Sequence, residues 1–320
     1  MLVPQLCSDA PDATLPVILE TFENHPELHI LCGEPLTATA FPGLTNRVFK
    51  LEAEEGSFFL RLPRPEAAGS IDRKAEARNL TLAAAAGLAV PPVFCDPGTG
   101  VLVTRAVEVR SIPAGLLGLP AYDLAQALGQ ALGRLHGSGA AFEGRLDPDS
   151  VLQMQWQGLL DMTEHRAEMA GLEEVLKLRM ADRDGPEYVP SHGDPSPGNC
   201  LMTAEGLWLI DWEFSGMSDP AWDLAYAVLE HEMRPDQEDV FLQAYAATGA
   251  VLPDAARLSV MKAKCDTVSA LWALEQVAAG RDETVFLLFA RQRRMRALQQ
   301  LADLACPPEH RPGIRDGGVS

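Results

Sequence analysis

The chain has 320 residues, 47% hydrophobic and 22% charged, a composition typical of soluble globular proteins long enough for two lobes. Its 26 Lys and Arg are outnumbered by 45 Asp and Glu, which gives a formal net charge of −19 at pH 7. This excess of negative charge argues against nucleic acid or an anionic membrane as the main partner, because both attract basic surfaces.

The first third of the chain predicts a small β-rich lobe with one helix. Residues 41–63 alternate apolar and polar side chains on both sides of an EEGS turn, a pattern typical of a β-hairpin. The next segment, 70–90, predicts a helix that Ser70 could cap and that Gly87 ends. Two more short strands are expected around the DPGTG turn at 96–100.

Beyond residue 110 the sequence changes to helical periodicity. The exception is 188–213, where a Pro- and Gly-rich loop is followed by two short strands joined at Ala204-Glu205-Gly206. The predicted helices cover 122–139, 151–169, 219–233, 238–249 and most of 255–303. We therefore predict an α+β fold of two lobes, a nucleotide-binding lobe at 1–108 and a larger, mostly helical catalytic and acceptor-binding lobe at 109–320.

The loop SHGDPSPGNC at 191–200 carries the polar side chains that most suggest chemistry. Its two Pro and two Gly exclude a regular helix or an interior strand, so these side chains lie on a stiff loop. Asp194 and Asn199 are five residues apart, and Asp211 ends an apolar strand that a hairpin would bring back beside them. Phosphoryl transfer needs a carboxylate base and oxygen ligands for a divalent ion, which makes Asp194 the candidate base and Asn199 and Asp211 candidate Mg²⁺ ligands.

Phosphoryl transfer also needs groups that hold phosphates, and the first lobe offers three candidates. Gly43 lies in a bend whose backbone N–H groups could face phosphate oxygens. Arg61 projects from the predicted strand FFLRLP, on the face opposite Phe58 and Leu60, and Glu76 follows on the helix. A strand cation paired with a helix glutamate is the kinase arrangement that orients the α- and β-phosphates.

These motifs resemble the aminoglycoside phosphotransferase and choline/ethanolamine kinase superfamily, which has a protein-kinase-like bilobal fold. The segments that carry the superfamily resemblance are HGDPSPGNC at 192–200 and LIDWEFSGMSDPAWDLA at 209–225. The narrower likeness, to choline/ethanolamine kinases including bacterial LicA-type proteins, rests on FPGLTNRVFKLE, FFLRLP and IDRKAEARN. Arginine at the strand position, here Arg61, and the pair Thr45-Asn46 after the loop glycine are typical of that branch.

The resemblance implies roles for several residues. It implies ATP and Mg²⁺ as cofactors, with Asp194 as the catalytic base and Asn199 and Asp211 on the metal. Gly43, Thr45, Asn46, Arg61 and Glu76 would hold the nucleotide. Glu213 and Asp223 fall in the motif after the metal aspartate and would organise the site, and Glu213 is also a candidate on the substrate side.

The acceptor is less well defined by the sequence. In choline kinases C-terminal aromatic residues surround the quaternary ammonium group, which offers no N–H donor and is bound through aromatic faces and carboxylates. By the same resemblance Trp272 falls on one tryptophan position, Glu275 on the other, and Phe289 on a later aromatic position. Glu275 could pair with a cationic substrate that has N–H donors, such as ethanolamine, or it could face solvent.

The predicted function is therefore an ATP- and Mg²⁺-dependent kinase acting on the hydroxyl of a small amino alcohol, choline or ethanolamine. The alternatives are a thiamine kinase, an aminoglycoside or sugar kinase, and an inactive nucleotide-binding pseudokinase with a regulatory role. Six cysteines without CxxC spacing, and no apolar run of membrane-spanning length, favour a cytoplasmic protein with reduced thiols. A small cationic acceptor is the expected partner, and a homodimer is one possible assembly.

Overall fold

The computed structural model describes residues 14–41, 43, 45–64, 71–109, 121–161, 164–178, 187–204 and 206–305. The chain forms two compact units, each assembled from two stretches of sequence. The first unit contains Met1–Leu146 and Glu187–Leu252, and the second contains Asp147–Pro186 and Pro253–Ser320. The predicted division into lobes at residue 108 falls inside the first unit and stays a prediction.

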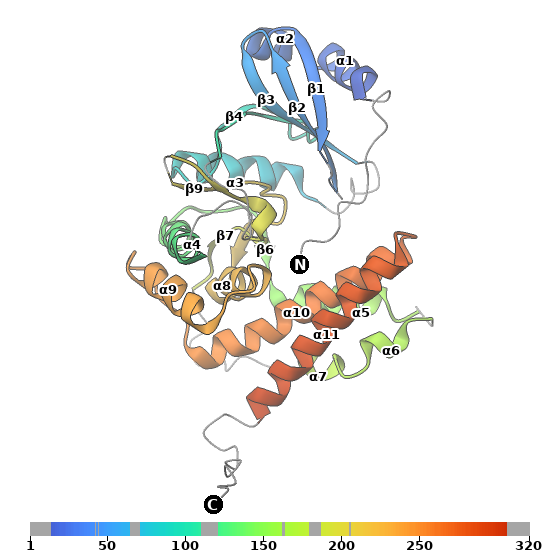
Figure 1. Cartoon of the computed structure of the whole chain (residues 1–320), viewed down its shortest axis with the longest axis vertical. Helices are drawn as coiled ribbons and strands as arrows, with labels where there is room; N and C mark the ends of the chain where they lie inside the picture. The colour runs from blue at the N-terminus through green and yellow to red at the C-terminus, as the bar shows by residue number, and fades with distance from the viewer. Residues whose placement is uncertain are drawn as a thin grey trace, which may run out of the picture. The chain divides into compact units, whose positions relative to one another are not determined.

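The first unit contains a five-stranded antiparallel sheet with the strand order β1-β2-β3-β5-β4 (Figure 1). Its central hairpin places Val48 opposite Arg61 and turns at Glu54-Glu55, so the predicted hairpin is confirmed. The two strands predicted around the DPGTG turn are also present. The strands are β1 (Pro35–Phe41), β2 (Asn46–Ala53), β3 (Gly56–Pro63), β4 (Pro92–Cys95) and β5 (Leu102–Arg105).

Alternation along β3 separates a core face from the face that carries Arg61, as the sequence predicts. Phe58 and Leu60 are fully buried in the hydrophobic core of the sheet. Arg61 points the other way and pairs with Glu76 of helix α3 (Arg73–Ala85). The N-cap of α3 is Asp72, whose side chain accepts from the backbone N–H groups of residues 74 and 75. The expected cap Ser70 lies outside the described residues, and the N-cap is two residues later than predicted.

Two helices precede the sheet, so the prediction of a single helix in the first third is wrong. They are α1 (Thr14–Asn24) and α2 (Glu27–Cys32). Ile18 and Phe22, four residues apart on α1, are buried in the same core as the strand residues. This i, i+4 spacing is the helical signal that the sequence contains in this segment.

The rest of the first unit supports the loop at 191–200. A three-stranded sheet combines β6 (Arg145–Leu146), β10 (Gly216–Ser218) and β7 (Val189–Ser191). The predicted hairpin after the loop is confirmed as β8 (Cys200–Met202) and β9 (Leu207–Leu209). The predicted helices are present as α4 (Ala121–His136), α8 (Pro220–Glu230) and α9 (Pro235–Ala246).

The second unit is helical throughout its described residues. Helix α5 (Pro148–Gly158) and the long helix α10 (Ala255–Ala278) pack together, and α10 also packs on α11 (Glu283–Ala305). Two short helices, α6 (Arg166–Met169) and α7 (Glu173–Leu176), complete it. The helix expected over 151–169 is thus broken, because α5 ends at Gly158.

The described helices include none with both the length and the apolar character needed to cross a membrane. Four cysteines in the described part of the chain are not joined in disulfide bonds: Cys32, Cys95, Cys200 and Cys265.

Gly129 sets how closely α4 can approach α9. A Cβ atom at Gly129 would lie 2.2 Å from the carbonyl oxygen of Phe241 in α9. We expect Gly129→Ala to lower the free energy of unfolding by roughly 1–3 kcal/mol, because the backbone would have to shift. Urea unfolding of the full chain measures this change. The matched control is Gly158→Ala at the end of α5, where nothing lies within 4 Å of the added Cβ. Equal effects of the two substitutions would show that the helix contact is not tight.

Candidate active site

Gly193 gives the loop at 191–200 its sharp turn. Its φ of +88° is a conformation that side chains other than glycine rarely adopt. A Cβ at this position would also lie 2.4 Å from the carbonyl oxygen of Phe214. Both constraints explain why a glycine directly precedes the candidate base Asp194.

Asp223, a fully buried carboxylate on α8, anchors the loop at 191–200 through hydrogen bonds. Its oxygens accept hydrogen bonds from the backbone N–H groups of His192, at 2.7 Å, and Gly193, at 2.9 Å. A third partner is His136 Nε2, at 3.1 Å. Burial alone would raise the pKa of Asp223, but the hydrogen bond from His136 and the nearby N–H donors hold it below its usual value. Asp223 therefore organises the loop, as the resemblance implied.

A second contact from α8 fixes the backbone at the turn. The indole Nε1 of Trp222 donates to the carbonyl oxygen of Gly193 at 2.9 Å. Beyond the helix, His231 Nε2 lies 3.1 Å from the carbonyl oxygen of Pro195, so a neutral imidazole can donate there. Residues on both sides of Asp194 are thus held in place from one helix and the segment that follows it.

Asp194, Asn199 and Asp211 come together as predicted. The side-chain Nδ2 of Asn199 donates to Oδ2 of Asp194 at 2.9 Å and to its carbonyl oxygen at 3.0 Å. Asp211 follows β9, and the backbone N–H of Ile210 donates to the carbonyl oxygen of Asn199 at 3.0 Å. The hairpin therefore returns Asp211 to the loop.

The carboxylates of this group lie close to other acidic side chains and are only partly exposed, the side chain of Asp211 to 32%. Burial, with Glu230 as the next cause, raises the pKa of Asp194 to about 7. Burial and the neighbouring Glu213 likewise raise the pKa of Asp211, and the nearby Arg61 opposes them. Asp211 also has a φ of +63°, a strained conformation for a residue with a side chain, and such strain is concentrated at functional sites. This backbone strain at Asp211 could not be predicted from the sequence.

This donor set fits Mg²⁺. The described residues contain no group of three or more His, Cys, Asp and Glu side chains placed to hold a metal ion. Mg²⁺ in kinase sites is bound through one or two carboxylates and by phosphate oxygens and water, so a cluster of three or more such side chains is not required. Asn199 turns its Nδ2 toward Asp194, which leaves Oδ1 as the end of the amide that could coordinate. Asn199 and Asp211 remain the predicted metal ligands.

Arg61 connects the five-stranded sheet to the candidate metal ligand. Its guanidinium pairs with Glu76, as predicted, and Nη1 also lies 3.1 Å from Oδ1 of Asp211. Neighbouring Glu76 and Asp211 outweigh the effect of burial and raise the pKa of Arg61, so its charge is secure. Arg61 Nε is buried and has no hydrogen-bond partner, and a phosphate oxygen could supply one.

The side chains of Thr45 and Asn46 donate hydrogen bonds to Glu213. Thr45 Oγ1 donates to Oε1 of Glu213 at 2.9 Å, and Asn46 Nδ2 donates to Oε2 at 2.9 Å. These bonds tie the loop after β1 to the segment just beyond Asp211. The predicted roles of Thr45 and Asn46 toward the nucleotide, and of Glu213 toward the substrate, stay predictions. The backbone N–H groups of the loop at Gly43 remain the candidates for phosphate.

Arg73 is a site residue that the sequence reasoning missed. It lies in the first turn of α3 and contacts Glu76, Glu213 and Asn46. Its i, i+3 spacing to Glu76 could have indicated this contact, because that spacing places both side chains on one face of a helix.

In the second unit, the predicted acceptor residues gather around helix α10. The rings of Trp272 and Phe289 meet edge to face with centroids 6.1 Å apart. One face of Phe289 is covered by the guanidinium of Arg293, whose Cζ lies 4.6 Å from the ring centroid. Burial raises the pKa of Glu275, and a hydrogen bond with the Gln155 side chain opposes this. The structure thus brings Trp272 and Phe289 together, while their role toward an acceptor stays a prediction.

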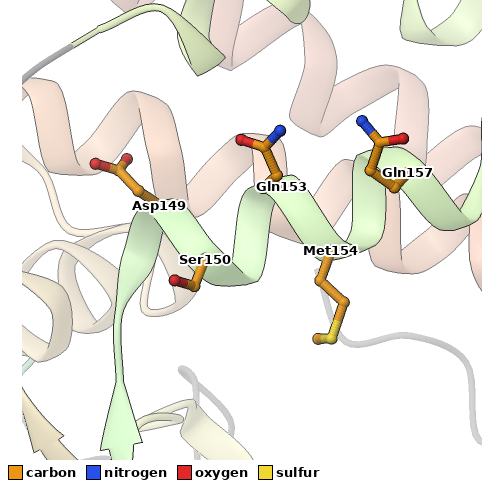
Figure 2. A pocket seen from close by; sticks show the side chains of 5 residues that line it. All are labelled: Asp149, Ser150, Gln153, Met154 and Gln157. Atoms are coloured by element: carbon orange, nitrogen blue, oxygen red, sulfur yellow. The ribbon is translucent and has the colours of Figure 1, made fainter.

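The second unit also has an open cavity of about 510 Å³ along α5 (Figure 2). In Figure 2 Asp149, Gln153 and Gln157 project from one side of the helix, and Met154 projects from the opposite side. The fifth lining residue is Ser150. The predicted acceptor residues are therefore separate from the lining of this cavity.

Comparison with known proteins identifies relatives over most of the chain. The model of a family described as "Phosphotransferase enzyme family" matches residues 37–259. Protein LicA of Haemophilus influenzae is 28% identical over 231 residues, which are 68% of this chain and 65% of LicA. The match thus spans just under two thirds of the length of that relative. A thiamine kinase of Escherichia coli is 32% identical over 104 residues, 32% of this chain and 36% of that protein.

Solved structures show the same architecture. A choline/ethanolamine kinase family protein from Mesorhizobium loti matches with a TM-score of 0.69 and 29% identity, covering 91% of this chain and 96% of that one. LicA in complex with AMP matches with a TM-score of 0.71 and 24% identity, covering 90% of this chain and 98% of that one. The kinase-like α+β fold and the superfamily resemblance predicted from the sequence are confirmed.

His231 should make stability depend on pH. Burial lowers its pKa to about 4, against about 6.5 in an unfolded chain. Below about pH 6.5 the unfolded chain therefore binds a proton that the folded chain excludes, and stability falls as the pH drops toward 4. We expect the wild type to lose roughly 2–3 kcal/mol more than His231→Gln between about pH 7.5 and about pH 4.5. Urea unfolding at both pH values measures the difference, and parallel losses would contradict a buried neutral imidazole.

Proposed function

Because the chain belongs to the phosphotransferase enzyme family, we propose that it transfers the γ-phosphoryl group of ATP to the hydroxyl of a small cationic amino alcohol, choline or ethanolamine. The observation that carries the proposal is the grouping of Asp194, Asn199 and Asp211 with the Arg61–Glu76 pair. This combination supplies a base, oxygen ligands and a phosphate-orienting cation in one unit.

Asp194 is the proposed general base. Its carboxylate would accept the proton of the acceptor hydroxyl as the oxygen attacks the γ-phosphorus. A pKa near 7 suits this step, because a base works best when its pKa is close to the working pH. Asn199 holds the carboxylate in position by donating to Oδ2, and Asp223 holds the backbone of the two preceding residues.

The nucleotide side of the site rests on Arg61. Its guanidinium, oriented by Glu76, would contact phosphate oxygens, and LicA bound to AMP is a nucleotide complex of the same fold. Asn199 and Asp211 would hold Mg²⁺, which when bound neutralises charge on the phosphates. The complete set of Asp194, Asn199 and Asp211 argues against an inactive pseudokinase.

The preference for an amino alcohol rests on the likeness to LicA and to the choline/ethanolamine kinase family protein. It is supported by Trp272 and Phe289, which offer an aromatic surface, and by the half-buried carboxylate of Glu275. Thiamine is the second candidate acceptor, because part of the chain matches thiamine kinase at a higher identity. The cytoplasmic location and the homodimer stay predictions.

We expect the wild-type protein to release ADP from ATP with choline or ethanolamine as acceptor, in a reaction that requires Mg²⁺. The acceptor panel should also contain thiamine, an aminoglycoside and several sugars. Asp194→Asn should lower kcat by roughly 10²–10⁴-fold, because it removes the base and keeps the size of the side chain. Mg-ATP binding, measured by calorimetry, should persist in this variant. Undiminished turnover in Asp194→Asn would contradict the assignment of Asp194 as the base. Turnover of thiamine or a sugar alone would contradict an amino alcohol as the acceptor.

Trp272→Ala should raise KM for the amino alcohol and leave KM for ATP nearly unchanged. Losing one aromatic contact to a cation costs roughly 0.5–2 kcal/mol, a change of a few-fold to about thirtyfold. Glu275→Gln should impair ethanolamine more than choline, because only ethanolamine has N–H donors for the carboxylate. If neither variant changes KM for any acceptor, Trp272 and Glu275 lie outside the acceptor site.

A further inference from the structure

The guanidinium of Arg73 contacts two carboxylates of the candidate site and one side-chain amide. Its Nη1 lies 2.8 Å from Oε2 of Glu76 and 3.5 Å from Oε2 of Glu213. Its Nη2 donates to Oδ1 of Asn46 at 3.1 Å. The side chain is only 10% exposed, so these contacts are shielded from water.

The two carboxylates need this cation. The side chains of Glu76 and Glu213 are 4% and 2% exposed, and a buried carboxylate without a charged partner is strongly destabilising. Glu76 already uses Oε1 for Arg61. Arg73 neutralises the other oxygen of Glu76 and also lies beside Glu213.

Arg73 also decides which way the amide of Asn46 points. By donating to Oδ1 of Asn46, it leaves Nδ2 to donate to Glu213. With the opposite orientation the amide would present its NH₂ group to the guanidinium and its oxygen to the carboxylate, and both contacts would be repulsive. The loop after Gly43 is thus tied to the residue two positions beyond Asp211 through an orientation that Arg73 sets.

We propose that Arg73 is a positioning residue for the nucleotide-binding part of the site. It holds Glu76 so that Arg61 is aimed at the phosphates, and it holds Glu213 and Asn46 so that the loop at Gly43 stays beside Asp211. Its catalytic readout rests on the phosphotransferase function proposed above. A planar guanidinium with several fixed N–H donors can serve three acceptors together, whereas a lysine ammonium is a single point of charge.

The kinetic test compares Arg73→Gln and Arg73→Lys with Arg78→Gln in the full chain. Arg78 lies on the same helix and makes an exposed ion pair with Glu143 at 3.1 Å, so its loss controls for removing a charge from α3. We expect Arg73→Gln to raise KM for ATP roughly tenfold or more, with a much smaller change in KM for the acceptor. Arg73→Lys should recover part of the loss, and Arg78→Gln should match the wild type. A KM for ATP in Arg73→Gln equal to that of Arg78→Gln would overturn the proposal.

A second measurement does not depend on turnover. Urea unfolding of Arg73→Gln, Glu213→Gln and the double variant forms a double-mutant cycle. We expect the double variant to lose less stability than the sum of the single losses, because removing both charges leaves neither unpaired. Strictly additive losses would overturn the proposal. If the wild type phosphorylates none of the acceptors, the proposed function fails, while this cycle and calorimetric binding of Mg-ADP still decide the role of Arg73.

Discussion

The site depends on the alternation of positive and negative side chains, of which Arg61, Glu76 and Glu213 are buried and Arg73 and Asp211 are partly exposed. From Asp211 the contacts run through Arg61 to Glu76, then through Arg73 to Glu213, so that each anion lies beside a cation. The participants come from β3, from α3 and from the segment after β9, which are distant in sequence. Because an unpaired buried charge is costly, the alternation fixes the relative positions of these three elements. The Arg61–Glu76 pair and Asp211 are therefore held in one arrangement by charge compensation as well as by apolar packing.

The loop that carries Asp194 is held by hydrogen bonds from its backbone to one buried carboxylate. The carboxylate of Asp223 accepts hydrogen bonds from two backbone N–H groups and from a histidine. Its negative charge therefore holds the main chain of the loop in place. Gly193 provides the backbone freedom that this shape requires. The candidate base and the candidate nucleotide-binding residues thus belong to two networks, one that holds a loop and one that joins separate elements.

Much of this site could be predicted because its signals are local in sequence. Asp194, Asn199 and Asp211 lie within one loop and one hairpin, and the alternation in β3 determines that Arg61 lies opposite the core. Arg73 could not be assigned, because its partners Asn46 and Glu213 are remote in sequence and an arginine at a helix start is usually solvated. The binding of Thr45 and Asn46 to Glu213 was hidden for the same reason. Helices α1 and α2 were missed because short helices that cover a sheet have only a few buried positions to form a pattern.

The division of the chain into units has a consequence for its synthesis. Residues Asp147–Pro186 interrupt the first unit, yet they belong with the C-terminal stretch that begins at Pro253. Helix α5 buries Leu152 and Gln155 in the folded chain, and α10, against which it packs, is made much later. At a translation rate of about 5–20 residues per second, α5 waits roughly 5–20 seconds for its partner. During this interval Leu152 and Gln155 of α5 lack the helix that covers them in the folded chain, so the second unit cannot be completed until the last third of the chain has been made.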